Sequence, residues 1–216
     1  MQHIWYVAYG SNLSRERFCT YLQGGQPNGS ERNYPGCRDT SDAADSFGLL
    51  ITGGVYFAGQ SSGWGAGMAF YDAEATGEVA ARAYLITTEQ FVDVLAQETR
   101  RPPGMTLDLE PFFQGDSYSE GVGGYPLLVR VGERRELPLV TFTRPRSTAS
   151  PLAAPSAPTW RQWRSVCVRP TDGQKYRSTA ICRRYRALSK AVGDTRSKSL
   201  SPGRTAREPL GEQYGR

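Results

Sequence analysis

The sequence predicts an α+β fold with a small, mixed, barrel-like β-sheet and a few flanking helices. Most of the first 145 residues form short apolar segments separated by turns rich in Gly and Pro. This close spacing is typical of a curled or barrel-like sheet rather than a doubly wound one. The regular pattern is lost toward the C-terminus, so we expect one domain over 1–150 and a Pro/Ser/Arg-rich tail over 151–216.

The domain is expected to begin with a buried strand that breaks at a glycine. Residues 4–9 (I-W-Y-V-A-Y) are apolar or aromatic, and the segment Gly-Ser-Asn at 10–12 follows directly. Glycine permits a tight turn, and Ser14 can cap a helix over 15–23. Backbone N–H groups would then point at one spot. That arrangement is either an anion or oxyanion cradle or an ordinary strand-to-helix turn.

The middle of the chain alternates between strands and turns. Residues 26–46 are polar and are predicted to be a loop. Thr87 or Thr88 can cap the clearest helix, 88–98, and Pro102-Pro103 must end it. Short strands are expected at 48–51, 55–58 and 68–71, and a longer strand at 79–87.

The last part of the domain is predicted to be a long loop followed by a hairpin. Residues 100–124 are acidic and rich in Gly and Pro, as in a surface loop that covers a site. Strands are expected over 125–131 and 137–143, with a turn at 132–135. Each strand contains a proline near its start, which places the pair near a sheet edge or limits its central pairing.

The basic charge of the chain belongs to the tail alone. Residues 1–158 carry a net charge of −5, and residues 159–216 carry +10 and all three lysines. We therefore expect no nucleic-acid partner for the domain. The tail is a disordered basic segment, a nucleic-acid arm or, as we favour, the product of a frameshift near residue 159. Sequencing the gene tests the frameshift, since an intact frame there would refute it.

Cysteine usage and hydropathy predict a cytoplasmic protein. The four cysteines have no C-x-x-C or zinc-type spacing, as expected of free thiols in a reducing compartment. No apolar run is long enough to cross a membrane, and no basic region precedes the first apolar run. We therefore expect neither a signal peptide nor a membrane partner.

The residue types present leave carboxylate chemistry as the main catalytic option. The chain has one histidine, His3, and no P-loop, Rossmann fingerprint or metal-ligand spacing. We therefore expect no metal and no cofactor. Glu98 ends the strongest apolar helix and could serve as a general base or acid; the alternative is a solvated glutamate at a helix end.

Four segments of the chain together resemble the γ-glutamylcyclotransferase-like family. They are Y-V-A-Y-G-S-N-L at 6–13, W-G-A-G-M-A-F at 64–70, V-A-A-R-A-Y-L-I-T at 79–87 and L-A-Q-E at 95–98. The resemblance spans residues 4–145 and rests mainly on the Y-G-S-N loop after the first strand. Residues 20–47 have no counterpart that we can assign, and the stretch between Glu98 and Tyr125 is longer than in compact members of the family.

The resemblance implies a metal-independent enzyme that acts on a γ-glutamyl small molecule. Glu98 would be the catalytic proton carrier, and the substrate would be bound by residues Tyr9, Gly10, Ser11, Asn12 and Tyr125. Intramolecular aminolysis would release 5-oxoproline and an amine or amino acid. Two alternatives are a non-catalytic module on the same fold, which binds a small molecule or a partner, and a basic-tailed nucleic-acid binder.

Overall fold

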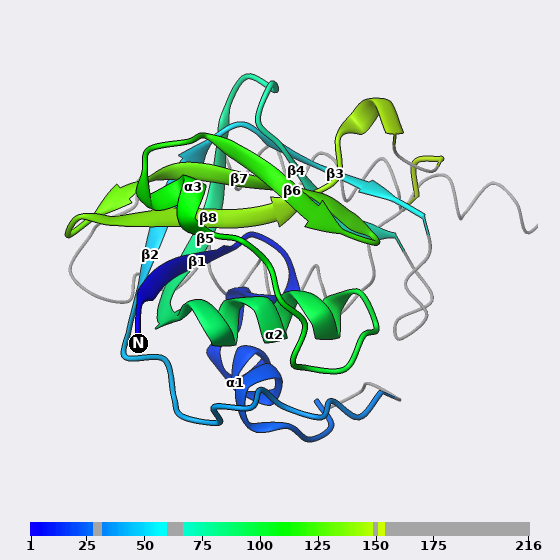
Figure 1. Ribbon diagram of the computed structural model, residues 1–216. Helices are drawn as coiled ribbons and strands as arrows, with labels where there is room; N and C mark the ends of the chain where they lie inside the picture. The colour runs from blue at the N-terminus through cyan, green and yellow to red at the C-terminus, as the bar shows by residue number, and fades with distance from the viewer. Residues whose placement is uncertain (28–31, 60–66, 149–150, 154–216) are drawn as a thin grey trace, which may run out of the picture.

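The computed structural model describes residues 1–27, 32–59, 67–148 and 151–153 (Figure 1). The predicted tail beyond residue 153 and the frameshift proposed near residue 159 lie outside the described residues. Residues 151–153 pair with the domain, because Ala153 N–H donates to the carbonyl of Phe57 at 2.9 Å.

A mixed six-stranded sheet forms the centre of the fold. Its strand order is β2-β5-β1-β8-β7-β6, and β1 and β8 run parallel whereas the other neighbours are antiparallel. The six strands are β1 (His3–Ala8), β2 (Asp45–Thr52), β5 (Glu78–Thr87), β6 (Tyr118–Val122), β7 (Tyr125–Arg134) and β8 (Leu137–Thr143). The mixed sheet with few helices is confirmed. The sheet is not closed, because the edge strands β2 and β6 do not pair with each other.

A second, two-stranded sheet stands beside the first. It consists of β3 (Gly54–Ala58) and β4 (Met68–Asp72), paired antiparallel. The bridge between Ala58 and Leu152 adds the end of the described chain to the outer edge of β3.

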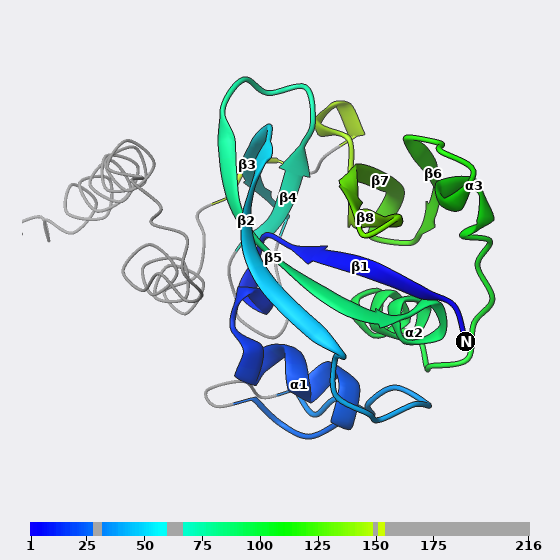
Figure 2. The ribbon, with the colours of Figure 1, turned by 90° about the vertical axis from the view of Figure 1, so that its left-hand side faces the viewer.

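The helices cover one side of the large sheet. Figures 1 and 2 show α2 (Thr88–Glu98) beneath the sheet and α1 (Arg15–Gln23) beneath α2. Both helices have the predicted bounds. Ser14 caps α1, and Thr87 forms a capping box with Gln90 at the start of α2. The short elements are η1 (Ser11–Leu13), α3 (Glu110–Phe113) and η2 (Arg146–Thr148).

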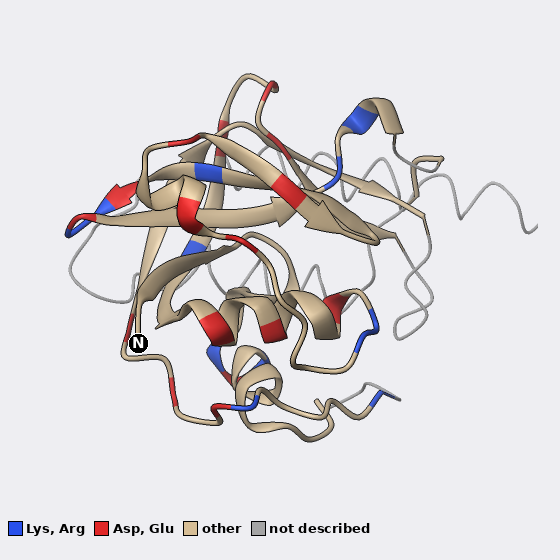
Figure 3. Ribbon diagram, in the orientation of Figure 1, with Lys and Arg blue, Asp and Glu red and all other residues tan. Residues whose placement is uncertain are grey.

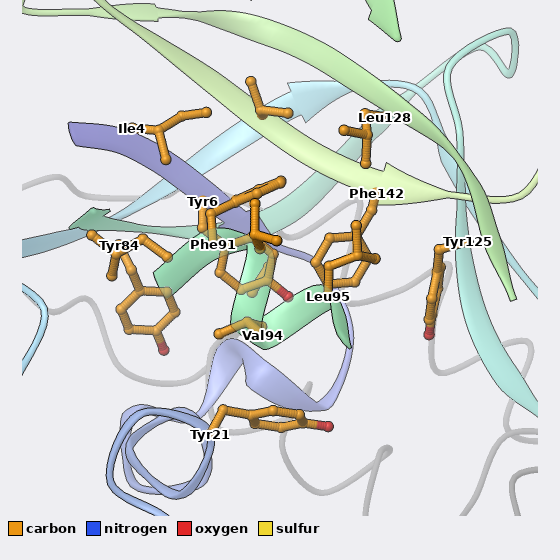
Figure 4. Packing of buried hydrophobic residues seen from close by; sticks show 14 of the residues in the cluster. Ile4, Tyr6, Tyr21, Tyr84, Phe91, Val94, Leu95, Tyr125, Leu128 and Phe142 are labelled. Atoms are coloured by element: carbon orange, nitrogen blue, oxygen red, sulfur yellow. The ribbon is translucent and has the colours of Figure 1, made fainter. Parts of the chain in front are cut away.

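Side chains alternate along β1 between two apolar clusters. Ile4, Tyr6 and Ala8 join the cluster that packs on α2, part of which Figure 4 shows. Trp5 and Val7 join the cluster on the opposite face. Both faces of the central strand are therefore buried, which explains why its sequence is apolar throughout.

The prediction of a single loop over 100–124 was wrong in part, because the segment contains α3 and β6. Phe112 is fully buried and anchors α3, and β6 is held by backbone pairing with β7. The hairpin turn lies at Arg135 and Glu136, both with positive φ, rather than at 132–135. Gly132 lies within β7 at a register shift, so the glycine marks a bulge and not the turn.

Candidate functional site

The turn after β1 presents three backbone donors in a row. Among the residues that the structure describes, none accepts a hydrogen bond from the N–H groups of Gly10, Ser11 or Asn12. The next two N–H groups are occupied, because Leu13 donates to the Gly10 carbonyl and Ser14 to the Ser11 carbonyl. These three N–H groups therefore have no acceptor within the described part of the chain, and their use as a cradle for an anionic group stays a prediction.

Glu98, the last residue of α2, lies against this turn. The side-chain amide Nδ2 of Asn12 donates to Oε1 of Glu98 at 3.0 Å. The carboxylate is half-buried and faces the turn after β1. Two segments that are 86 residues apart in the sequence thus meet in one polar cluster.

Tyrosine hydroxyls surround this pair. Asn12 Nδ2 also donates to the hydroxyl of Tyr6 at 3.3 Å. In Figure 4 the hydroxyls of Tyr21 and Tyr125 point toward the region beside the end of α2. Burial, and then the negative charge of Glu98, raise the pKa of Tyr6, Tyr21 and Tyr125 well above the ordinary value. These phenols therefore remain protonated. The hydroxyl of Tyr21 donates to that of Tyr34 at 3.3 Å, so the hydroxyls of Tyr6 and Tyr125 are the ones that can donate to a ligand.

Tyr125 opens β7, where burial and then the nearby charge of Glu98 raise its pKa, and its role in substrate binding stays a prediction. Its ring packs edge-on against Phe142, with centroids 4.9 Å apart, and against Phe70 at 5.4 Å. No described residue forms a hydrogen bond with its hydroxyl. The ring is thus fixed by its aromatic neighbours, while its polar atom is available.

Tyr9 is used differently from the other predicted site residues. Its hydroxyl donates to the carbonyl of Phe142 at 2.8 Å, and its ring packs on Tyr71 in the cluster on the opposite face of the sheet. The structure therefore gives the hydroxyl of Tyr9 a partner in the core, and a role in substrate binding stays a prediction.

Arg17 holds the turn in place, although the sequence pattern alone did not single it out. Its side chain is 6% exposed, and Nε donates to Oγ of Ser11 at 2.8 Å. A second nitrogen donates to the hydroxyl of Tyr34 at 3.2 Å, and the guanidinium lies 5.8 Å from that ring's centre. The available signal was spacing: Arg17 precedes the buried Tyr21 by four positions on α1, so it lies on the buried face. No such signal marks Tyr34, which lies in an irregular loop.

Other hydrogen bonds fix the main chain of the turn. The Tyr84 hydroxyl on β5 donates to the carbonyl of Asn12 at 2.8 Å, and Arg82 Nε donates to the carbonyl of Leu13 at 3.1 Å. Oδ1 of Asn12 is buried and accepts no hydrogen bond from the described residues.

Three other properties of the described residues bear on the predicted chemistry. They contain no group of three or more His, Cys, Asp or Glu side chains that could hold a metal ion. No helix among them is long and apolar enough to cross a membrane. Cys19 and Cys37 are free thiols, and burial raises the pKa of Cys37 to about 12.

Comparison with known proteins found a partial relative. No protein-family model matches the chain. A curated protein named Histone deacetylase 5, from Arabidopsis thaliana, is 31% identical over 156 residues, and the match covers 65% of this chain and 23% of that protein. The chain thus spans about a quarter of the length of the relative that it matches.

Two solved structures are also similar to this chain. One is described as a gamma-glutamyl cyclotransferase, with 15% sequence identity and a TM-score of 0.42 over 86% of this chain and 99% of the other. The second is an uncharacterized protein from Homo sapiens, with 14% identity and a TM-score of 0.43 over the same shares of the two chains.

Proposed function

We propose that the protein is a γ-glutamylcyclotransferase-type enzyme, which cleaves a γ-glutamyl compound into 5-oxoproline and an amine or amino acid. The observation that carries this proposal is the 3.0 Å hydrogen bond between Asn12 and Glu98. It joins the Y-G-S-N turn to a single carboxylate, the two features on which the sequence resemblance rests. The phenols around the pair supply neutral donors for a polar substrate.

The reaction needs one proton carrier and a bound substrate held in a bent conformation. The α-amino nitrogen of the γ-glutamyl group attacks the carbonyl carbon of its own side-chain amide. The new C–N bond closes a five-membered ring, and the old C–N bond breaks to release the amine. Because nucleophile and electrophile belong to one molecule, fixing their geometry removes much of the entropic barrier.

Glu98 is the group we assign to the proton transfers. Its Oε1 is bound to Asn12, and no described residue donates to its other oxygen. That free oxygen takes a proton from the attacking amine and returns a proton to the departing nitrogen. The N–H groups of Gly10, Ser11 and Asn12 bind either the substrate carboxylate or the oxyanion that forms at the attacked carbonyl.

The test is a panel of γ-glutamyl amines and γ-glutamyl amino acids, incubated with the full chain and assayed for 5-oxoproline. Product from at least one compound, with loss of that product in Glu98→Gln, is the expected result. An acetyl-lysine peptide belongs in the panel because of the name of the partial relative, and release of acetate instead of 5-oxoproline would overturn the proposal.

The matched control is Glu89→Gln on the same helix. Glu89 lies at the opposite end of α2, where it forms an exposed ion pair with Arg38 at 2.9 Å. This variant should form product like the wild type. Product that persists in Glu98→Gln would remove Glu98 as the proton carrier. If wild type binds a γ-glutamyl compound but never turns it over, the fold is a binding module.

A further inference from the structure

Arg144, the residue that follows β8, is a partly buried cation that no described carboxylate pairs with. Its Nε donates to the carbonyl of Gly124 at 3.2 Å, and its own carbonyl accepts from the hydroxyl of Tyr56 at 2.6 Å. The terminal nitrogens, Nη1 and Nη2, donate to no residue in the described ranges. The ion pairs between described residues use other arginines, which are Arg38, Arg130, Arg135 and Arg146. The guanidinium is therefore fixed in position while several of its donors are still available.

Arg144 lies against the aromatic residues of the candidate site. Its guanidinium carbon is 5.8 Å from the centre of the Phe70 ring, a favourable place for a cation. Phe70, on β4, packs on Tyr125 with the two ring centroids 5.4 Å apart. Tyr125 follows Gly124 in the chain, so Arg144 contacts both the residue before Tyr125 and the ring that packs on it.

The turn between β6 and β7 brings Arg144 close to the end of α2. Gly123 in this turn packs on Thr99, since a Cβ at Gly123 would lie 3.4 Å from the Cβ of Thr99. Thr99 directly follows Glu98, the residue that we assign to the proton transfers. Gly124, the next residue of the turn, accepts from Arg144. One glycine turn therefore contacts both the residue after Glu98 and the guanidinium of Arg144.

This placement suits a substrate whose departing amine carries a negative charge. In the proposed reaction Glu98 must reach the nitrogen that departs. An acidic group close to that nitrogen would be repelled by the Glu98 carboxylate unless a cation lay nearby. Arg144 is such a cation, and its partial burial strengthens its attraction for an anion. A neutral departing amine would gain nothing from it.

We propose that Arg144 determines which γ-glutamyl compounds the protein accepts, by binding an anionic group on the departing amine. The inference rests on the proposed function, because it specifies the amine that leaves. A carboxylate is the group that best fits the paired N–H donors of a guanidinium. The favoured substrates are therefore compounds with an acidic departing amine, rather than those with a neutral or basic one. The bonds that form and break are those of the ring closure, and Arg144 neither gains nor loses a proton.

The test compares two substrates that differ only in this anionic group. γ-Glutamyl-alanine and γ-glutamyl-ethylamine share the glutamyl part and the bond that breaks, but only the first has a carboxylate on the departing amine. We expect kcat/KM of the full chain to be about 10- to 100-fold higher for γ-glutamyl-alanine, the value of hydrogen bonds to a charged group. Arg144→Gln should abolish this preference. A wild-type protein without the preference would overturn the inference.

Arg146→Gln is the matched control. Arg146 lies close by in η2, is 60% exposed, and forms an ion pair with Asp72 at 3.9 Å. The variant removes the same charge from the same region, and it should keep the preference for γ-glutamyl-alanine. If Arg146→Gln abolishes the preference as fully as Arg144→Gln, the preference reflects the general positive charge of this region and the inference is wrong.

An exchange of charge separates recognition from support of the turn, because Arg144→Gln also loses the bond to Gly124. γ-Glutamyl-ethylenediamine carries a positive charge on its departing amine. Arg144→Glu should prefer this compound to γ-glutamyl-alanine, the reverse of the wild type. An equal loss for all three compounds in both variants would mean that Arg144 supports the turn or binds the carboxylate of the glutamyl part, which all three share. Either result would overturn the inference.

Calorimetric binding of the same compounds separates this inference from the proposed function. Binding is measured for wild type and for Glu98→Gln, each with and without Arg144→Gln. If γ-glutamyl-alanine binds more tightly than γ-glutamyl-ethylamine only when Arg144 is present, and no 5-oxoproline forms, the inference stands and the proposed function fails. If both compounds yield 5-oxoproline without a preference, the proposed function stands and this inference fails. Absence of binding and of product would overturn both.

Discussion

Asp93 and Glu98, two carboxylates on helix α2, differ in how many hydrogen bonds their oxygens accept from the rest of the protein. Figure 3 marks the acidic residues of the helix in red. Asp93 is fully buried, and its oxygens accept from Arg38 N–H at 2.9 Å and from Gly104 N–H at 2.8 Å. Glu98, five residues later, accepts from the amide of Asn12 and has one oxygen without a partner among the described residues.

The difference separates a structural carboxylate from one available for chemistry. Asp93 joins α2 to the loop at Arg38 and to the segment that leaves the helix at Gly104, and Arg38 Nε adds an ion pair at 3.1 Å. A carboxylate with all its acceptors filled holds its neighbours in place but has no oxygen for a substrate. Glu98 has that oxygen, and its single neutral partner does not bind it as a counter-ion would.

The largest expected effect is on turnover and comes from Glu98→Gln. We expect the rate of 5-oxoproline formation to fall about 10²- to 10⁴-fold, the usual contribution of a general acid–base group. The melting temperature should stay near that of wild type, because the amide oxygen of glutamine still accepts from Asn12. Initial rates and thermal melting by circular dichroism measure both. Lost activity together with a large fall in melting temperature would assign Glu98 a structural role.

The same chemical change at Asp93 should act on stability instead. Asp93→Asn places an amide N–H against donors from Arg38 and Gly104, so at least one buried donor loses its acceptor. We expect the free energy of unfolding to fall by about 2–4 kcal/mol. Urea denaturation of both variants gives this difference. If Asp93→Asn is as stable as Glu98→Gln, then Asp93 contributes no more to the stability of the fold than Glu98 does.

The helices and most strands could be predicted because their signals are local. Thr87 caps α2 and Pro102-Pro103 prevent its continuation, so both ends can be read within a few residues. β6 could not be predicted in this way. Its sequence, Y-S-E-G-V, has the composition of a turn, and it becomes a strand only because β7 provides backbone partners.

The meeting of Asn12 and Glu98 could be expected from the resemblance, but their surroundings could not. Alternation along β1 predicts that Tyr6 is buried, yet its contact with Asn12 depends on how β1, η1 and α2 are placed in space. Tyr34 lies in a loop without periodicity. Its position depends on a backbone pair with Gly25, at 3.0 and 2.8 Å, that no local pattern announces.

A smaller effect should distinguish two serines that both bond Arg17. Oγ of Ser11 accepts from Arg17 Nε at 2.8 Å, and Oγ of Ser14 accepts from Arg17 N–H at 3.3 Å as the helix cap. Each change to alanine should lower the free energy of unfolding by about 1 kcal/mol. Only Ser11→Ala should also lower kcat/KM, because it removes the hydrogen bond by which Arg17 holds the N–H cradle in place. Equal kcat/KM values in the two variants would contradict a role for Arg17 in positioning the cradle.

The smallest effect concerns the third carboxylate of α2, Glu89, and completes the comparison. Glu89 and Arg38 form an ion pair at 2.9 Å, but their side chains are 40% and 45% exposed. Solvent screens such a pair, so a double-mutant cycle of Glu89→Gln and Arg38→Gln should give a coupling of only about 0.2–0.5 kcal/mol. At about 1 M salt the coupling should disappear, since the screening length falls to about 3 Å. Arg38 also contacts Asp93, so the cycle is repeated with Asp93→Asn as background. A coupling above about 1 kcal/mol that survives high salt would contradict this comparison. It would mean that Arg38 binds the exposed Glu89 as firmly as it binds the buried Asp93.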